Sequence, residues 1–259
     1  MANRPNQGRS PVRAAPGWNA EEPDSSSLTQ AALDAIREDI LSGELTPNTR
    51  LRMQMLRERY DIGASPLREA LSRLVSDNLV LSLQRRGFVV APVSLSDFRD
   101  LTNLRKLLEK EALSQALARG DDRWEAAIVA AFHQLNRVQE RFDPNDRDSV
   151  VAWEDMNREF HDALVSACKS AWLLRTRNTA YICSERYRRL CLSITSISRD
   201  VKAEHKQLLE AAMDRDVSTI HVLISEHLEA TFRKVEESGK LDEVALDQDY
   251  TIGNLIFYR

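Results

Sequence analysis

Residues 64–74 read ASPLREALSRL and are the stretch that decides the fold of the N-terminal part of the chain. The pair Ser65-Pro66 predicts a helix start, because a hydroxyl can cap the first turn and proline suits the first helical position. Leucines follow at helical spacing and give the helix one apolar face, which leaves Arg68 and Arg73 on other faces. We therefore expect a short amphipathic helix that presents arginines to solvent.

The segments on either side of this helix complete a small domain. Upstream, apolar residues at helical spacing predict one helix over 28–41 and a second, shorter helix that carries Leu56 and Tyr60. Downstream, the β-rich runs 79–83 and 88–91 flank a glycine-containing turn and predict a hairpin. Three helices and a hairpin within about 65 residues are the layout of a winged helix-turn-helix.

The remainder of the chain is helical by the same criterion, with 3.6-residue apolar stripes separated by short polar connections. The expected helices cover residues 97–119, 122–142, 149–168, 170–197, 200–214 and 217–238. The fold class is therefore mainly α, with an N-terminal winged helix-turn-helix followed by an all-α helical bundle.

Length and composition agree with two folded domains in one soluble chain. At roughly 150 residues per domain, 259 residues with 42% hydrophobic and 29% charged side chains predict two modest cores. We expect a disordered tail over 1–25, the DNA-binding domain over 26–95 and the helical domain over 96–238. The segment 239–259 has no predicted role. No secretory signal or membrane-spanning run is present, so a cytoplasmic protein without membrane contacts is expected.

The charge distribution favours a nucleic-acid partner for the first domain. The whole chain has a net charge of -4, yet residues 28–93 hold nine arginines against eight acidic residues, and the acidic excess lies beyond them. Every basic residue before Lys106 is arginine. The planar guanidinium group suits bidentate recognition of phosphates and guanine edges better than lysine does. The alternative explanation for this use of arginine is the codon bias of a GC-rich genome.

Residues 35–94 resemble the DNA-binding domain of the GntR family of bacterial transcription regulators. The pieces ILSGEL, ASPLREALSRL and RRGFVV carry this resemblance. Two departures are Asn48, where the family commonly has glycine after proline, and Ala64, where it commonly has an arginine. The resemblance implies double-stranded operator DNA as the partner.

Several residues are expected to contact that DNA. Arg68, near the start of the recognition helix, is the first candidate for a base-edge contact. The other expected contacts are Ser65, Arg52, Arg57, Arg59 and Arg73 toward the backbone, and Arg85, Arg86 and Gly87 in the wing. For each arginine, a solvated helix face or a surface ion pair, such as Arg68 beside Glu69, is the alternative interpretation.

The helical part resembles the effector-binding FCD domain of the FadR subfamily of GntR regulators. The motifs are LRKLLEKEAL, NREFHDAL, SERYRRL, RDVKAEH and SEHLEA, over residues 97–236. The resemblance implies a homodimer that binds a small organic acid.

A metal site is expected within this domain. Asn157 and His161 are four residues apart on one helix and share a face. By the resemblance, His205 and His227 supply the remaining ligands, and imidazole suits zinc or nickel. The family most often has aspartate where this chain has Asn157, so weaker binding or a site of three histidines is expected. Asp155 cannot substitute, because its helical position faces elsewhere. A hydrogen-bonded core histidine is the alternative for His161.

An acidic effector also needs cationic side chains. Arg105 matches a position where the family often presents arginine to its ligand, and Arg186 or Arg188 is a second candidate. The alternative for Arg105 is an ion pair with Glu109, one helical turn away.

Together these features predict a transcriptional regulator, expected to be a repressor released from its operator by a small mono- or dicarboxylate bound at a metal-containing pocket. A metal-responsive regulator, in which the ion is itself the signal, is one alternative. A metallohydrolase with a zinc-bound water is the other, but no HExxH, GxSxG or phosphate-loop spacing supports it. No catalytic residue is predicted.

Overall fold

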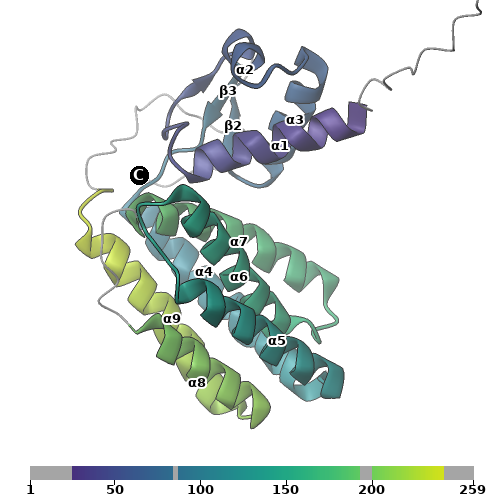
Figure 1. Ribbon diagram of the computed structural model, residues 1–259, viewed down its shortest axis with the longest axis vertical. Coiled ribbons are helices and arrows are strands. Elements are labelled where there is room, and N and C mark those ends of the chain that lie inside the picture. The colour runs from purple at the N-terminus through teal and green to yellow at the C-terminus, as the bar shows by residue number, and fades with distance from the viewer. Residues whose placement is uncertain (1–24, 84–86, 193–199, 242–259) are drawn as a thin grey trace, which may run out of the picture.

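The computed structural model describes residues 25–83, 87–192 and 200–241, which form a small N-terminal domain stacked on a helical bundle (Figure 1). The N-terminal domain contains α1 (Ser25–Leu41), β1 (Arg50–Leu51), α2 (Met53–Tyr60), α3 (Ala64–Ser76), β2 (Val80–Leu83) and β3 (Gly87–Val90). The three strands pair in the antiparallel order β1-β3-β2. The predicted winged helix-turn-helix is confirmed.

Strand β1 was not predicted from the sequence. It has two residues, and Leu51 pairs with Phe88 of the wing. A run this short shows no alternation of apolar and polar residues, so only its pairing with β3 defines it as a strand.

The apolar stripe of α3 is buried as expected. Ala70 and the leucines Leu67, Leu71 and Leu74 have no exposed surface and pack against α1 and the sheet. The expected capping role of Ser65 is wrong. Helix α3 begins at Ala64, the cap position is Gly63, and no side chain accepts a hydrogen bond there. Because the first helical N–H groups have no intrahelical acceptor, Pro66 also fits the third helical position and does not fix the start.

The second domain has the six expected helices, α4 (Leu95–Arg119), α5 (Asp122–Gln139), α6 (Arg147–Val165), α7 (Ala171–Leu192), α8 (Val201–Met213) and α9 (Val217–Glu237). Several predicted ends are a few residues off, and the expected helix over 170–197 runs beyond the described part of α7. All six helices begin with a side-chain cap, from Ser94, Asp121, Asp146, Ser170, Asp200 and Asp216. The expected tails over 1–25 and 239–259 lie almost wholly outside the described residues.

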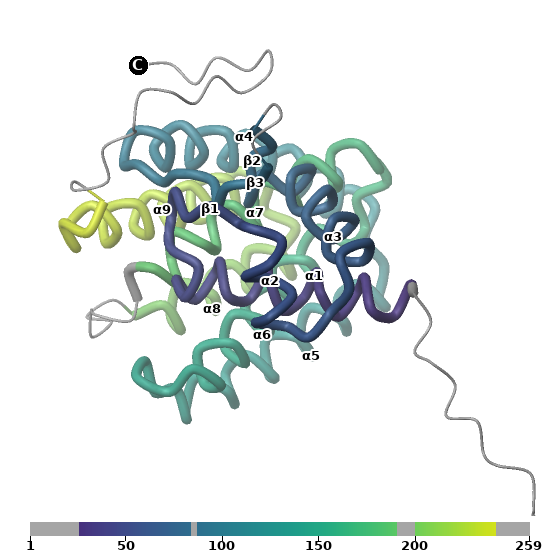
Figure 2. The backbone as a smooth tube through the Cα atoms, turned by 90° about the horizontal axis from the view of Figure 1, so that it is seen from above, coloured from purple at the N-terminus to yellow at the C-terminus, as the bar shows by residue number. Residues whose placement is uncertain are grey.

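Helix α4 is the centre of the bundle and packs against α9, α7 and α6. Seen from above, the N-terminal domain covers one end of the bundle (Figure 2). Helix α7 joins the two domains, because Ile182 is buried in the hydrophobic core of the N-terminal domain. Within the described residues, none of the helices has the length and apolar character needed to cross a membrane.

Candidate functional site

The exposed face of α3 carries the residues expected to contact DNA. Ser65, Arg68 and Arg73 are all exposed, opposite the buried leucines. The ion pair weighed for Arg68 is made instead by its neighbours, because Glu69 binds Arg73 at 2.6 Å. Arg68 has no ion-pair partner among the described residues, so its guanidinium is available to a ligand.

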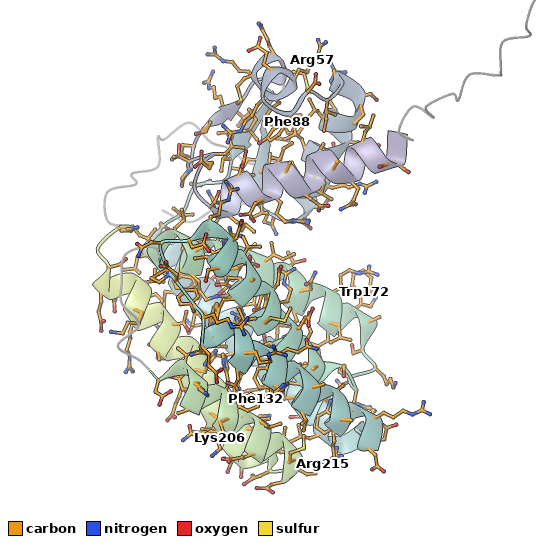
Figure 3. All side chains as sticks on the ribbon, in the orientation of Figure 1. Arg57, Phe88, Phe132, Trp172, Lys206 and Arg215 are labelled. Carbon is orange, nitrogen blue, oxygen red and sulfur yellow. The ribbon has the colours of Figure 1, made fainter. Side chains whose placement is uncertain are left out.

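The other expected DNA contacts lie on neighbouring elements. Arg52 and Arg57 are exposed, and Arg57 projects from the end of the N-terminal domain that lies away from the bundle (Figure 3). Gly87 begins β3 with a φ of +89°, a conformation that favours glycine and is needed where the wing turns. Arg85 and Arg86 lie outside the described residues.

The helical domain brings three of its histidines together. His161 comes from α6, His205 from α8 and His227 from α9, and one ligand nitrogen of each lies within 4.8 Å of the others. The ring centroids are 5.0–5.4 Å apart. His161 and His205 are buried, and Phe160 packs edge-on against both rings. The side chains therefore converge on one partly apolar space.

Asn157 lies one helical turn before His161 and is also buried. Its Nδ2 donates a hydrogen bond to Tyr181 Oη at 2.9 Å, while its Oδ1 is buried and has no hydrogen-bond partner among the described residues. Such an oxygen loses solvation unless a ligand replaces the water. Asp155 is exposed on another face of α6, as its spacing predicted.

Glu204 supports the histidine cluster and was not among the site residues predicted from the sequence. Its carboxylate Oε2 lies 2.8 Å from His227 Nδ1. A carboxylate on one ring nitrogen orients the imidazole and leaves Nε2 as the ligand atom, an arrangement common behind metal-bound histidines. The only sequence signal for it is the adjacency of Glu204 to His205.

The electrostatic environment keeps His161 in the form that binds metal. Burial lowers the pKa of His161 well below its usual range, and the nearby His227, His205 and Arg105 lower it further. A neutral imidazole offers a lone pair to a cation, whereas a protonated one does not. Three such nitrogens and one amide oxygen, with a carboxylate behind one ring, fit a divalent ion such as zinc or nickel.

Arginines gather around Tyr181, the hydrogen-bond partner of Asn157. The ring of Tyr181 lies 4.8–5.8 Å from four guanidinium carbons, those of Arg105, Arg158, Arg177 and Arg188. The expected pair of Arg105 and Glu109 exists at 3.0 Å, but it is buried rather than exposed. Arg105 also donates to Ser184 at 3.0 Å, and its Nε has no hydrogen-bond partner among the described residues.

Arg186, another expected effector contact, lies at the connection between the two domains and not in the arginine cluster around Tyr181. Its Nη2 donates to the carbonyl of Ala91 at 2.7 Å and its Nη1 to that of Pro92 at 3.5 Å, so it holds the connection between the domains. The neighbouring Arg188 is the one that reaches the arginine cluster, where Glu154 binds it at 2.7 Å.

The fold and its arginine-bearing face define a DNA-binding regulator with a helical second domain. Residues 28–90 match the family described as "Bacterial regulatory proteins, gntR family", and residues 100–230 match the FCD domain. The chain belongs to the GntR family of transcriptional regulators, whose members are regulators and not enzymes.

Two relatives are similar over most of their length. The uncharacterized HTH-type transcriptional regulator BphR of Paraburkholderia xenovorans is 40% identical over 83% of this chain and 88% of its own. The HTH-type transcriptional repressor GlaR of Escherichia coli is 35% identical over 78% and 94%. The solved structure of E. coli McbR/YncC shares the fold, with a TM-score of 0.66 at 20% identity, covering 82% of this chain and 98% of that one.

Proposed function

We propose that this regulator is a homodimeric repressor that leaves its operator when a small dicarboxylate binds, together with a divalent metal ion, in the pocket of the helical domain. The observation that carries the proposal is the convergence of three histidine nitrogens within 4.8 Å of one another, with Asn157 one helical turn before His161 and its Oδ1 without a hydrogen-bond partner among the described residues. The ion, zinc or nickel, would be held by Asn157, His161, His205 and His227.

The charge of this ligand set favours an anionic effector. Three imidazoles and one amide are neutral, so none of the ligands compensates either charge of a bound divalent ion. When bound, the ion supplies an open coordination position for a carboxylate. An effector with two carboxylates balances both charges. The Nε of Arg105, which has no hydrogen-bond partner in the described part of the chain, offers it a donor.

The proposed homodimer is supported by the number of DNA-contacting elements in one chain. Each chain offers one recognition helix, α3, and one wing. Two copies related by a two-fold axis would place two such helices on a pseudo-palindromic operator about one helical turn apart. Repression agrees with the name of the E. coli relative GlaR, an HTH-type transcriptional repressor.

The first test combines elemental analysis of the purified chain with a thermal-shift screen of straight-chain dicarboxylates of three to six carbons, before and after EDTA. We expect near-stoichiometric metal and a rise in melting temperature with one acid that EDTA abolishes. Saturation at 100 times Kd should stabilise by about 2.7 kcal/mol.

Matched histidine variants identify the site. His205→Ala should lose both the metal and the acid-induced shift. His221→Ala should retain both, because His221 is bound to Ser114 and to the Lys110 carbonyl, outside the cluster. Light scattering should give the mass of a dimer for both variants. Absence of metal, or equal shifts with and without EDTA, would contradict the proposal.

A further inference from the structure

Helix α7 presents one face to the pocket and another to the N-terminal domain. On the pocket face, Arg177 binds Glu109 at 2.8 Å and donates to the backbone carbonyl of His161 at 3.0 Å. Tyr181 and Arg188 continue this face at intervals of four and seven residues. A displacement of Asn157 or His161, the two proposed ligands on α6, therefore acts directly on α7.

The opposite face of α7 touches the DNA-binding domain at several points. Ile182 is buried in that domain's core, and Cys183 Sγ lies 3.4 Å from the carbonyl oxygen of Asp77, the residue that follows α3. Gly43, just beyond α1, lies against Leu190 of α7. A Cβ added at Gly43 would be 3.2 Å from Leu190 Cδ2. The contact between the domains is therefore tight and has little room for adjustment.

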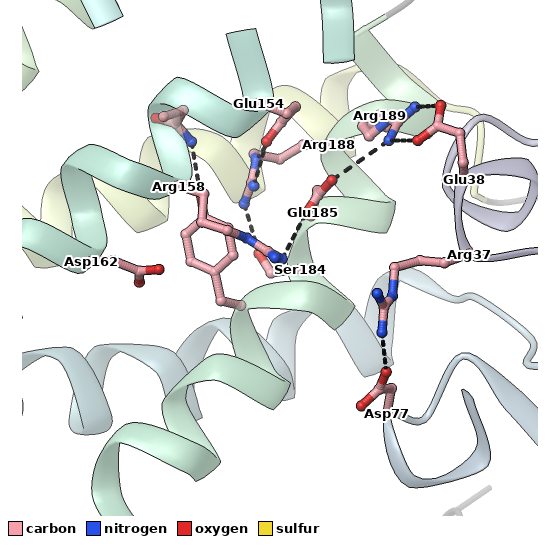
Figure 4. A network of polar contacts seen from close by, with 12 residues as sticks. Arg37, Glu38, Asp77, Glu154, Arg158, Asp162, Ser184, Glu185, Arg188 and Arg189 are labelled. Carbon is pink, nitrogen blue, oxygen red and sulfur yellow. Dashed lines mark hydrogen bonds and ion pairs between the residues drawn. The ribbon is translucent and has the colours of Figure 1, made fainter. Parts of the chain in front are cut away.

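Three consecutive residues of α1 join this interface to the helix-turn-helix. Arg37 binds Asp77 at the end of α3 at 2.7 Å. Glu38 receives two hydrogen bonds from Arg189 of α7, at 2.8 and 2.5 Å (Figure 4). Asp39 accepts from the Arg59 guanidinium and from Tyr60 Oη, both at 2.7 Å, at the end of α2.

The pocket reaches Glu38 through adjacent arginines. Glu154 lies on α6, one turn before Asn157, and binds Arg188 through two hydrogen bonds of 3.2 and 2.7 Å. The next residue, Arg189, makes the two bonds to Glu38, and its side chain is only 4% exposed. The arginine end of the ion pair is therefore shielded from solvent, whereas Glu38 is 29% exposed, and the fork geometry fixes the orientation of α1 relative to α7.

We propose that the segment Arg37-Glu38-Asp39 is the coupling element of this regulator, and that the Glu38–Arg189 ion pair transmits occupancy of the pocket to the helix-turn-helix. The inference rests on the proposed function, because it needs a ligand in the pocket. Binding that moves α6 or α7 shifts Arg188 and Arg189 together, and the rigid ion pair then turns α1. Since α1 also holds the ends of α2 and α3, the DNA-reading surface moves with it.

The test measures coupling as a ratio, the operator Kd in zinc plus acid divided by the operator Kd in EDTA. An operator duplex selected from a random library is titrated with protein in EDTA, in zinc alone, and in zinc with each dicarboxylate of three to six carbons. Calorimetry follows zinc and acid binding separately. In the wild type, we expect operator Kd to rise at least about tenfold, equivalent to about 1.4 kcal/mol, with the acid that binds.

Glu38→Gln removes the charge and keeps the shape of the side chain. We expect the ratio to fall to within about twofold of one, with the calorimetric affinities for zinc and acid unchanged within about twofold. The matched control is Glu125→Gln, which breaks an ion pair with Arg215 of 2.5 Å inside the helical domain. This control should keep the wild-type ratio.

A charge swap tests whether loss of coupling in a single variant is due to misfolding. Glu38→Arg and Arg189→Glu should each abolish coupling, and the double variant should restore at least half of the wild-type ratio on a logarithmic scale. A wild-type ratio in Glu38→Gln, or no recovery in the double variant, would overturn the coupling proposal while leaving the metal pocket intact. If calorimetry detects no zinc or acid binding in the wild type, the proposed function itself fails and the coupling proposal fails with it.

Discussion

Asn157 and Tyr181 are joined by a hydrogen bond of 2.9 Å, in which the amide Nδ2 donates to the phenol oxygen and leaves Oδ1 without a partner among the described residues. An amide has one acceptor atom and one donor atom, so only one of its two orientations can bind a cation. In the observed orientation the phenol oxygen accepts from the amide nitrogen and the amide oxygen is left for the ion. The same phenol ring is the centre of the arginine cluster.

Removing this hydrogen bond should weaken metal binding. We expect Tyr181→Phe to lower zinc affinity about tenfold, the lower end of the effect of removing a supporting hydrogen bond behind a metal ligand. Asn157→Asp should raise zinc affinity, because it adds a negative charge. Isothermal calorimetry measures both effects.

The double variant provides the control. A carboxylate presents an acceptor in either orientation, so Tyr181→Phe should cost less than about threefold when combined with Asn157→Asp. Equal losses in both backgrounds would show that Tyr181 acts through packing and not through the amide.

The exposed arginines of α2 and α3 give a prediction about DNA binding that does not depend on the histidine pocket. Arg68→Ala should weaken operator binding by about 1–3 kcal/mol and relax the preference at one base position. Arg57→Ala should weaken all sequences alike and reduce the salt slope by about one. Anisotropy titrations at several salt concentrations against single-base operator variants separate the two. Uniform weakening by Arg68→Ala would assign this residue to the phosphate backbone.

The local parts of this architecture could be predicted because they depend on short-range periodicity. The stripe of Leu67, Leu71 and Leu74 specifies its helix regardless of what it packs against. Asn157 and His161 share a face for the same reason. By contrast, His205 and His227 lie on other helices, and only the family resemblance related them to His161 before the structure brought them together.

The contacts that were missed join segments far apart in the chain. Glu38 and Arg189 are 151 residues apart, and nothing in the local sequence of either residue indicates the other. Nothing in the motif SERYRRL distinguishes Arg186 from Arg188. The two positions are 200° apart around the helix, so Arg186 binds the connection between the domains and Arg188 lies in the arginine cluster. The short strand β1 is likewise defined only by its partner.

Glu109 should be important for stability. It is buried between Arg105 and Arg177, whose charges and hydrogen bonds outweigh the cost of burial and hold its pKa below the usual range. Glu109→Gln removes the carboxylate partner of the buried Arg105 and leaves Arg177 with Asp162 alone. We expect a loss of about 3–5 kcal/mol in the free energy of unfolding. Urea denaturation tests this, with the exposed Glu111→Gln on the same helix as the control. A loss below about 1 kcal/mol would contradict it.

Asp216, the cap of α9, should give a measurable acid dependence. Hydrogen bonds from the Thr219 hydroxyl and backbone N–H, and from Ser218, lower its pKa from 3.8 to about 2. Because the folded value is depressed, its contribution to stability is present above pH 3.8 and is lost as the pH falls toward 2. Asp216→Asn keeps a capping oxygen that does not titrate. The wild type should therefore lose on the order of 2 °C more than this variant between pH 5 and pH 2. Parallel melting curves would refute this.

The central claim, that the histidine pocket controls DNA binding, is tested most directly by operator anisotropy with wild type and His161→Ala in zinc plus the acid that binds, and in EDTA. Circular dichroism first establishes that the variant retains its helical content. We predict that zinc and the acid weaken operator binding of the wild type at least about tenfold and leave that of His161→Ala unchanged. Equal weakening of both proteins would place the effector elsewhere, and no weakening of the wild type would contradict the account.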